Sequence, residues 1–177
     1  MDAGDIVIRQ ATAGDFDAWF ALYESVAAEG KWIGGELPVD REQRWRSFDA
    51  TLNDADSLSL LAWTRDGVLV GELTIQIRRG IADLGMCVAE QSRGKGVGSA
   101  LMTNAIEWAR EHGAHKVTLS LWPHNASAHA LYAKHGFEIE GLLRRHYRRR
   151  NGQLWDAVVM GLVLDTDAPG SPYFATD

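Results

Sequence analysis

The chain has 177 residues, of which 46% are hydrophobic and 24% are charged, and these values are typical of one globular domain. Its 24 acidic and 18 basic residues give a net charge of −6, which argues against electrostatic binding to nucleic acid or to an anionic membrane. The single cysteine, Cys87, excludes an intramolecular disulfide and a cysteine zinc cluster. We find no signal-peptide pattern and no apolar run of the roughly 20 residues that a membrane helix needs, so we expect a cytoplasmic protein.

The first half of the chain predicts one strand, two helices and then three strands. A capping-box pattern at Thr12 and Asp15 marks the first helix, and a loop over 28–40 with three glycines and a proline separates the two helices. The expected elements are a strand over 6–9, a helix from Thr12, a helix over 41–52, and strands over 57–64, 68–78 and 82–88.

The second half alternates between helices and strands. The expected elements are a glycine-rich turn, a helix to about residue 112, a strand over 116–122, a helix from Asn125 to Gly136, and two paired strands over 137–142 and 157–164. The order is strand, helix, helix, three strands, helix, strand, helix, two strands. It predicts a mixed α/β layer fold in one domain over 1–164. A polar tail over 165–177 follows, which could be disordered or could dock onto the domain through Tyr173 and Phe174.

The most informative segment is the glycine-rich run Gln91-Ser92-Arg93-Gly94-Lys95-Gly96-Val97-Gly98, which enters a helix. Free backbone N–H groups at a helix start favour phosphate, and Arg93 and Lys95 add positive charge. A Walker loop would need Ser or Thr after Lys95, and a dinucleotide fingerprint would need its third glycine one position later. Both patterns are rejected, which leaves another polyphosphate site or a tight turn required only for packing.

A second motif, Asn125-x-x-Ala128-x-x-Leu131-Tyr132-x-x-x-Gly136-Phe137, follows about thirty residues later. Together the two motifs resemble the cofactor site of the GNAT acetyltransferase superfamily, whose pyrophosphate motif can be read from Gln91 or from Arg93. The resemblance covers the chain from about Ile6 to Leu164 in element order and is strongest over 82–141.

The resemblance implies a mixed sheet of about seven strands with helices on both faces and a V-shaped splay between the central strands. It also implies acetyl-CoA as cosubstrate, with pantetheine lying along one strand and pyrophosphate at the glycine turn. The implied cofactor-binding residues are Met86, Cys87, Val88, Arg93, Gly94, Lys95, Gly96, Val97, Gly98, Ser99, Asn125 and Ser127.

Tyr132 occupies the tyrosine position of the family, and a buried phenol is suited to protonate the leaving thiolate. The alternative is a core tyrosine with an incidental contact. Asp83 is the candidate base, since some relatives carry a glutamate at this strand, although an aspartate at a strand edge is more often simply solvated. We expect Cys87 to be a small buried hydrophobe rather than a nucleophile, and no histidine spacing indicates a metal.

The acceptor side is expected near the loop over 28–40. Glu29 could bind an ammonium group there or simply end a surface helix, and Trp32 could form a wall of the acceptor site or pack as an ordinary apolar residue. Arg144, Arg145, Arg148, Arg149 and Arg150 form the one strongly basic run, with a hairpin turn expected at Asn151-Gly152. This run could be a solvated hairpin that discourages aggregation, or it could bind the cofactor's 3′-phosphate, an acidic acceptor or an acidic partner chain.

We therefore predict an N-acetyltransferase that moves an acetyl group from acetyl-CoA directly to a primary amine, with Tyr132 as general acid. A small molecule such as an amino acid, amine or antibiotic is the preferred acceptor. The alternatives are acetylation of ribosomal-protein N-termini, which the region over 137–160 also resembles, and a non-catalytic acyl-CoA-binding module. By resemblance alone, a homodimer is expected.

Overall fold

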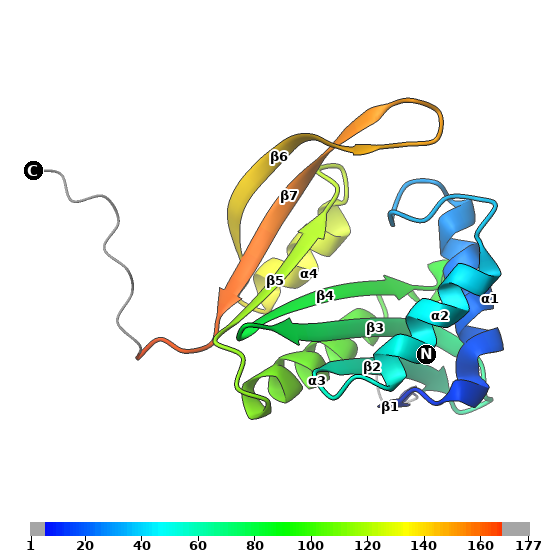
Figure 1. The fold of residues 1–177 in the computed structure, drawn as a ribbon, viewed down its shortest axis with the longest axis horizontal. Coiled ribbons are helices and arrows are strands. Elements are labelled where there is room, and N and C mark those ends of the chain that lie inside the picture. Colours follow the sequence, from blue (N-terminus) through cyan, green and yellow to red (C-terminus); the bar gives the residue numbers. More distant parts are fainter. Residues whose placement is uncertain (1–5, 168–177) are drawn as a thin grey trace, which may run out of the picture.

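The computed structural model describes residues 6–167, which form a seven-stranded sheet with helices on both faces (Figure 1). The helices are η2 (Ala13–Asp15), α1 (Phe16–Ala28), α2 (Arg41–Leu52), η3 (Glu90–Ser92), α3 (Val97–Glu111) and α4 (Ala126–Lys134). The strands are β1 (Ile6–Gln10), β2 (Ser57–Thr64), β3 (Leu69–Arg78), β4 (Ile81–Val88), β5 (Lys116–Leu121), β6 (Glu138–Arg148) and β7 (Leu154–Val163). The predicted element order is thus confirmed.

The sheet is open, with strand order β1-β2-β3-β4-β5-β7-β6. Its parallel neighbours, β4 and β5, pair only at Ile81–Lys116, Ala82–Val117 and Asp83–Thr118. β4 continues to Val88 in register with β3, so its other edge leaves β5 beyond Asp83. This separation is the predicted V-shaped splay.

Each face of the sheet carries its own hydrophobic core. On one face, Leu101, Met102 and Ala105 of α3 pack against apolar residues of β2 to β5, and Tyr132 of α4 joins them. On the other face, the aromatic rings of α1 and α2 form a cluster that includes Phe16, Trp19, Phe20 and Phe48. Helical spacing of these large side chains buries them on one stripe of each helix, as the sequence predicts.

The start of the first helix and the bounds of the last two strands differ from the sequence prediction by more than two residues. The α-helix begins at Phe16 rather than at Thr12, because η2 comes first and the Asp15 carboxylate accepts bonds from Arg9 and from the Thr12 N–H. The last two strands are longer than predicted, so much of the arginine run lies within β6. Paired strands tolerate polar residues when both faces meet solvent, and β6 is exposed along nearly all of its length.

The turn at Asn151-Gly152 is confirmed, since the backbone N–H of Gly152 donates to the Arg149 carbonyl and Arg149 N–H donates to the Gln153 carbonyl. Tyr173 and Phe174 of the predicted tail lie outside the described residues. Over residues 6–167, none of the helices is both long enough and apolar enough to cross a membrane.

Candidate active site

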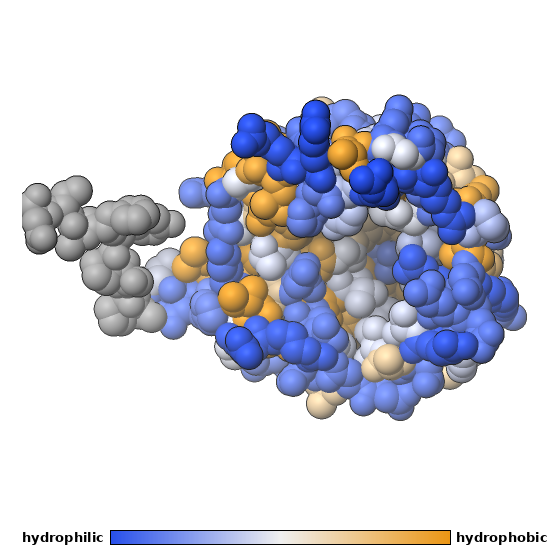
Figure 2. Space-filling model, turned by 45° about the horizontal axis from the view of Figure 1, so that its top comes forward, coloured by the Kyte–Doolittle hydropathy of each residue, from blue (hydrophilic) through white to orange (hydrophobic). Residues whose placement is uncertain are grey.

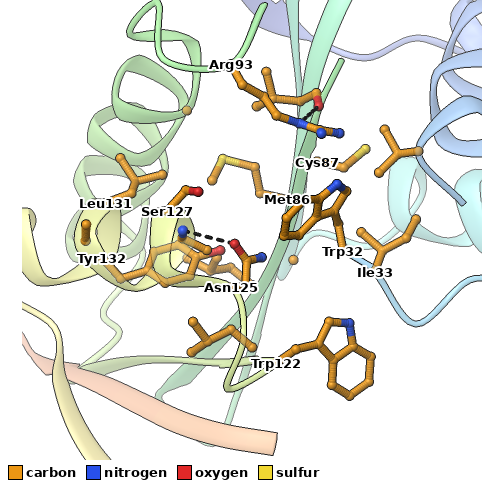
Figure 3. A pocket seen from close by; sticks show the side chains of 18 of the residues that line it. Trp32, Ile33, Met86, Cys87, Arg93, Trp122, Asn125, Ser127, Leu131 and Tyr132 are labelled. Carbon is orange, nitrogen blue, oxygen red and sulfur yellow. Dashed lines mark hydrogen bonds between the residues drawn. The ribbon is translucent and has the colours of Figure 1, made fainter. Parts of the chain in front are cut away.

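A cavity of about 850 Å³ lies in the splay and joins both sides of the sheet. It is bounded by the β4 edge, the glycine-rich turn, the end of β5, α4 and the loop between α1 and α2. Figure 2 shows this hollow near the middle of one face, with a largely hydrophilic rim. Figure 3 shows that side chains from these separate elements point into the same space.

The β4 edge forms the floor. Leu84, Gly85, Met86, Cys87 and Val88 line the cavity, and in the described part of the chain no strand pairs with β4 on this side after Asp83. An unpaired strand edge offers backbone N–H and C=O groups to an extended amide-containing ligand. The pantetheine arm of CoA, which contains two amides, has the shape and chemistry that fit this edge.

The glycine-rich turn closes the cofactor end. Gly94 and Gly96 adopt positive φ values of 73° and 84°, and Gly96 is the N-cap of α3. Both glycines line the cavity at a helix start, where backbone N–H groups without intrahelical partners stabilise a phosphate. Gly98 lies so close to Leu131 that an added Cβ would come within 3.0 Å of it. The turn therefore fits a pyrophosphate through its backbone.

Arg93 is not free to contribute its charge to that end. Its guanidinium donates to Glu29 at 2.5 and 2.8 Å and to the Val88 carbonyl at 3.0 Å. Glu29 accepts hydrogen bonds from Arg93 and from the Trp32 indole N–H. These bonds, that from Arg93 having the larger effect, hold the pKa of Glu29 below its usual value. Glu29 and Arg93 thus join the acceptor loop to the glycine turn.

Tyr132 lies inside the cavity on α4, 6% exposed and beside Phe137. Burial raises the pKa of Tyr132 to about 12, so its hydroxyl remains protonated at neutral pH. Nearby, the Asn125 side chain accepts a bond from the Ala128 N–H and caps α4 (Figure 3). This cap fixes the start of the helix that carries Ser127 and Tyr132.

The structure brings most of the predicted residues together, but not all of them. Trp32, Tyr132 and ten of the twelve cofactor candidates line the cavity, whereas Glu29, Asp83, Lys95 and Val97 do not. Val97 is packed in the core against Gly71, and Lys95 is exposed. Asp83 lies at the vertex of the splay, where partial desolvation raises its pKa above the ordinary aspartate value.

Cys87 is 5% exposed, in keeping with a small buried side chain, and burial raises the pKa of its thiol. Directly opposite it on β3 is Glu72, a buried carboxyl that the sequence analysis missed. Burial raises the pKa of Glu72 to about 7, and the Trp19 indole N–H donates to it at 3.4 Å. An acidic residue within the apolar strand Leu69–Ile77 was the signal that could have found it.

The acceptor end has aromatic walls that sequence reasoning identified only in part. Trp32 and Ile33 face the cavity from the α1–α2 loop, and Trp122 and Tyr147 face it from the end of β5 and from β6. The rings of Trp122 and Tyr147 pack edge to face, with their centres 4.8 Å apart. Trp122 and Tyr147 were missed because no local pattern shows that these two segments converge.

Among the described residues, 6–167, those that line the cavity include no aspartate, glutamate or histidine. Within 6–167, no group of three or more histidine, cysteine or acidic side chains is placed to hold a metal ion. The polar groups facing the cavity are therefore hydroxyls, amides, backbone groups and the cations Arg93 and Lys134.

Residues 19–137 match the model of the acetyltransferase (GNAT) family. The L-amino acid N-acetyltransferase AaaT of Escherichia coli is 33% identical, over 90% of this chain and 98% of that protein. A solved ribosomal-protein-alanine N-acetyltransferase from Brucella melitensis is 30% identical, covers 89% of this chain and 99% of its own, and has a TM-score of 0.81. A phosphinothricin acetyltransferase from Sinorhizobium meliloti, solved in complex with AcCoA, shares the fold with a TM-score of 0.82 at 19% identity, over 97% and 95% of the two chains.

Proposed function

This chain belongs to the acetyltransferase (GNAT) family, and from that premise we propose that it acetylates the primary amine of a small molecule, with an amino acid as the leading acceptor class. It is an acetyl-CoA-dependent N-acetyltransferase. The observation that carries the proposal is one continuous cavity through the β4–β5 splay. It joins the glycine turn suited to phosphate to an acceptor pocket with aromatic walls.

The cofactor end uses mainly backbone groups. The turn at Gly94, Gly96 and Gly98, together with Ser99, would hold the pyrophosphate, and the β4 edge from Met86 to Val88 would pair with pantetheine. Asn125 and Ser127 would bind nearby. Because Lys95 is exposed and Val97 is in the core, their share in this site is limited to placing the backbone of the turn.

Acetyl-CoA supplies the acetyl group as a thioester whose carbonyl carbon an amine can attack. A backbone N–H of the β4 edge polarises that carbonyl, and the Tyr132 hydroxyl donates its proton to the departing sulfur. The pKa of Tyr132, about 12, keeps this proton in place until the thiolate forms. Solvent then returns a proton to the phenolate.

The amine must lose a proton before or during the attack. The cavity has no carboxylate or imidazole lining, so desolvation between Trp32 and Trp122 favours the neutral amine that reacts. Asp83, at the vertex of the splay, is the candidate that would take the proton through water. Its raised pKa improves it as a base near neutral pH.

The acceptor class rests on similarity and on the lining of the cavity. The E. coli relative acts on L-amino acids by its name, and aromatic side chains line the acceptor end on two sides. A protein N-terminus is the second candidate, favoured by the 30% identity to the Brucella enzyme. We also propose a homodimer, which exposed Ile139, Leu142 and Leu143 on the edge strand β6 support.

The test is a thiol-release assay with acetyl-CoA, a panel of free L-amino acids and simple amines, and N-terminal peptides, with acetylated products identified by mass spectrometry. We expect release of CoA with at least one free amino acid. Binding of acetyl-CoA by calorimetry without transfer to any amine would instead support the non-catalytic module. Analytical ultracentrifugation tests the dimer.

A further inference from the structure

Two consecutive arginines at the turn between β6 and β7 cross the molecule to the α1–α2 loop. Figure 1 shows that this hairpin and this loop face each other across the end of the splay. Arg149 forms an ion pair with Glu36 at 2.8 Å and donates to the carbonyls of Ile33 at 3.2 Å and Gly30 at 3.3 Å. The turn is thus fastened to the loop at three points by one side chain.

Arg150 extends the same attachment along the loop. Its guanidinium donates to the Leu37 carbonyl at 2.5 Å and the Pro38 carbonyl at 3.0 Å, while its backbone N–H donates to Glu36 at 2.8 Å. We call this set of contacts, from Arg149 and Arg150 to residues 30–38, the clasp.

The Arg149 side chain is only 4% exposed, which is unusual for an arginine. Its guanidinium lies 4.4 Å from the ring centre of Trp155 and 5.7 Å from that of Trp122. A buried cation needs its charge balanced and its N–H groups bonded, and Glu36, the two carbonyls and the two rings together meet that need. The clasp is therefore a specific arrangement rather than a solvated basic run.

The clasp acts on the residues that form the acceptor pocket. Between its anchor points at Gly30 and Glu36, the loop carries Trp32 and Ile33 into the cavity. On the hairpin side, Trp122 lines the cavity and packs against Trp155, which Arg149 covers. Loosening Arg149 would release both walls from one another.

We propose that the Arg149–Glu36 clasp is a specificity determinant: it closes the acceptor end of the cavity, so that a small free amine fits and a polypeptide N-terminus does not. A peptide would need room for the chain behind its first residue, and the clasp joins the loop that carries Trp32 to the side of the cavity that carries Trp122. Arg149 is a positioning residue, because it acts through the loop and the aromatic walls. The inference rests on the proposed transfer to small amines.

Arg148 provides a matched control. It is the adjacent arginine, exposed, and within 6–167 its side chain forms no ion pair or hydrogen bond. Arg148→Met therefore removes the same charge from the same hairpin without touching the clasp.

The experiment compares the wild type with Arg149→Met, Glu36→Gln, their double variant, Arg149→Lys and Arg148→Met. Steady-state kinetics are measured with the best free amino acid, with peptides of increasing length that begin with that residue, and with acetyl-CoA varied. We expect Arg149→Met and Glu36→Gln to raise the KM for the amino acid by about tenfold, with the double variant no worse than Arg149→Met, because the two groups form one coupled contact.

We expect the KM for acetyl-CoA to change by less than about twofold, since the glycine turn is not part of the clasp. The ratio of peptide to amino-acid kcat/KM should rise by about tenfold or more in the loosened variants. Arg149→Lys keeps the charge near Glu36 but loses the forked carbonyl bonds, so it should fall between wild type and Arg149→Met. Arg148→Met should match the wild type.

Several results would overturn the inference. Equal use of peptides and amino acids by the wild type would remove the proposed barrier, and unchanged selectivity in Arg149→Met would remove Arg149 from it. If Arg149→Met fails to fold, as judged by loss of acetyl-CoA binding in a thermal-shift assay, Glu36→Gln and Arg149→Lys decide the question by the same selectivity ratio. The proposed function fails in a different way, namely no acetyl transfer to any amine by the wild type.

Discussion

The two ends of the cavity are built in different ways. Most of the cofactor end is assembled from neighbouring stretches of chain, since β4, the glycine turn and the start of α3 follow one another over residues 84–99, while Asn125 and Ser127 come from further along, at α4. The acceptor end depends on contacts such as that between Arg149 and the Ile33 carbonyl, which are 116 positions apart. Glycine conformation and a helix start suffice at one end, whereas the other needs tertiary packing of two loops.

The two ends therefore depend on side-chain identity to different degrees. The cofactor is the same for every acetyl-CoA-dependent enzyme, and backbone groups that recognise it do not depend on side-chain identity. The acceptor walls are side chains carried on a loop and a hairpin, which are the parts of a fold that tolerate change. We expect perturbations at the two ends to separate into effects on acetyl-CoA and effects on the amine.

The largest effect is expected where the two ends meet, at Tyr132. Tyr132→Phe removes the proposed proton donor but keeps the ring in place, so kcat should fall about 10²- to 10³-fold. The KM for acetyl-CoA should stay within about twofold, since no binding contact is lost. Steady-state thiol release measures both values.

Tyr147→Phe is the control for this prediction, because it deletes a hydroxyl at the acceptor end of the same cavity. It should leave kcat nearly unchanged and alter only the amine KM. Equal losses of kcat in the two variants would contradict a special role for Tyr132.

An effect on the stability of the fold is expected at Glu72, which lies on β3 opposite Cys87 of the β4 edge. Burial raises the pKa of Glu72 to about 7 in the folded protein, so between about pH 5 and pH 7 the folded state keeps a proton that the unfolded state releases. The free energy of unfolding should therefore decrease by about 2.5 kcal/mol from pH 5 to pH 8 through this group and level off near pH 8.

Glu72→Gln should lack this decrease. Between pH 5 and pH 8, its free energy of unfolding should therefore rise relative to that of the wild type. Urea unfolding of both proteins at several pH values measures the difference, which cancels the titration of all shared groups. Glu107→Gln, at an exposed position of α3, is the control and should keep the wild-type slope. Parallel pH profiles for Glu72→Gln and wild type would contradict the prediction.

The cofactor end can be tested by one added methyl group. Gly96→Ala places a side chain on a residue with φ of 84° at the start of α3, and the strain should lower acetyl-CoA affinity about tenfold by shifting the turn. Calorimetric titration with CoA measures it.

Gly67→Ala is the matched control, since Gly67 has a φ of 79° in the β2–β3 turn and an added Cβ meets no atom within 4 Å. Both variants should lose about 1 kcal/mol of stability through the same backbone strain. Only Gly96→Ala should lose CoA affinity, while the amine KM should stay as in the wild type.

The smallest effect is expected at the connection between the ends. Glu29→Gln weakens the contact with Arg93 and Trp32, so the acceptor loop should be held less firmly and the amine KM should rise about threefold. The released Arg93 lines the cofactor end, so acetyl-CoA affinity should not decrease. A weaker acetyl-CoA affinity with an unchanged amine KM would show that Glu29 serves the cofactor end instead.

Local signals in the chain were enough for the secondary-structure elements and the glycine turn. Periodic apolar residues, caps such as Asn125 and glycines with positive φ act over a few residues, so strands, helices and the turn at Gly94–Gly98 were predictable. The strand order and the V-shaped splay came from the resemblance of two motifs, because nothing in the periodicity of β4 shows where its pairing with β5 stops.

Only the tertiary structure decided which arginines of the run are buried and which side chains form the acceptor walls. The sequence shows five arginines of similar context, yet Arg149 is buried against Glu36 while Arg148 is exposed. Burial of a cation depends on partners that another segment brings to it, and those partners are over a hundred residues away. Short-range sequence patterns contain the rules for local backbone geometry, but they do not specify which distant carbonyls and carboxylates will surround a side chain.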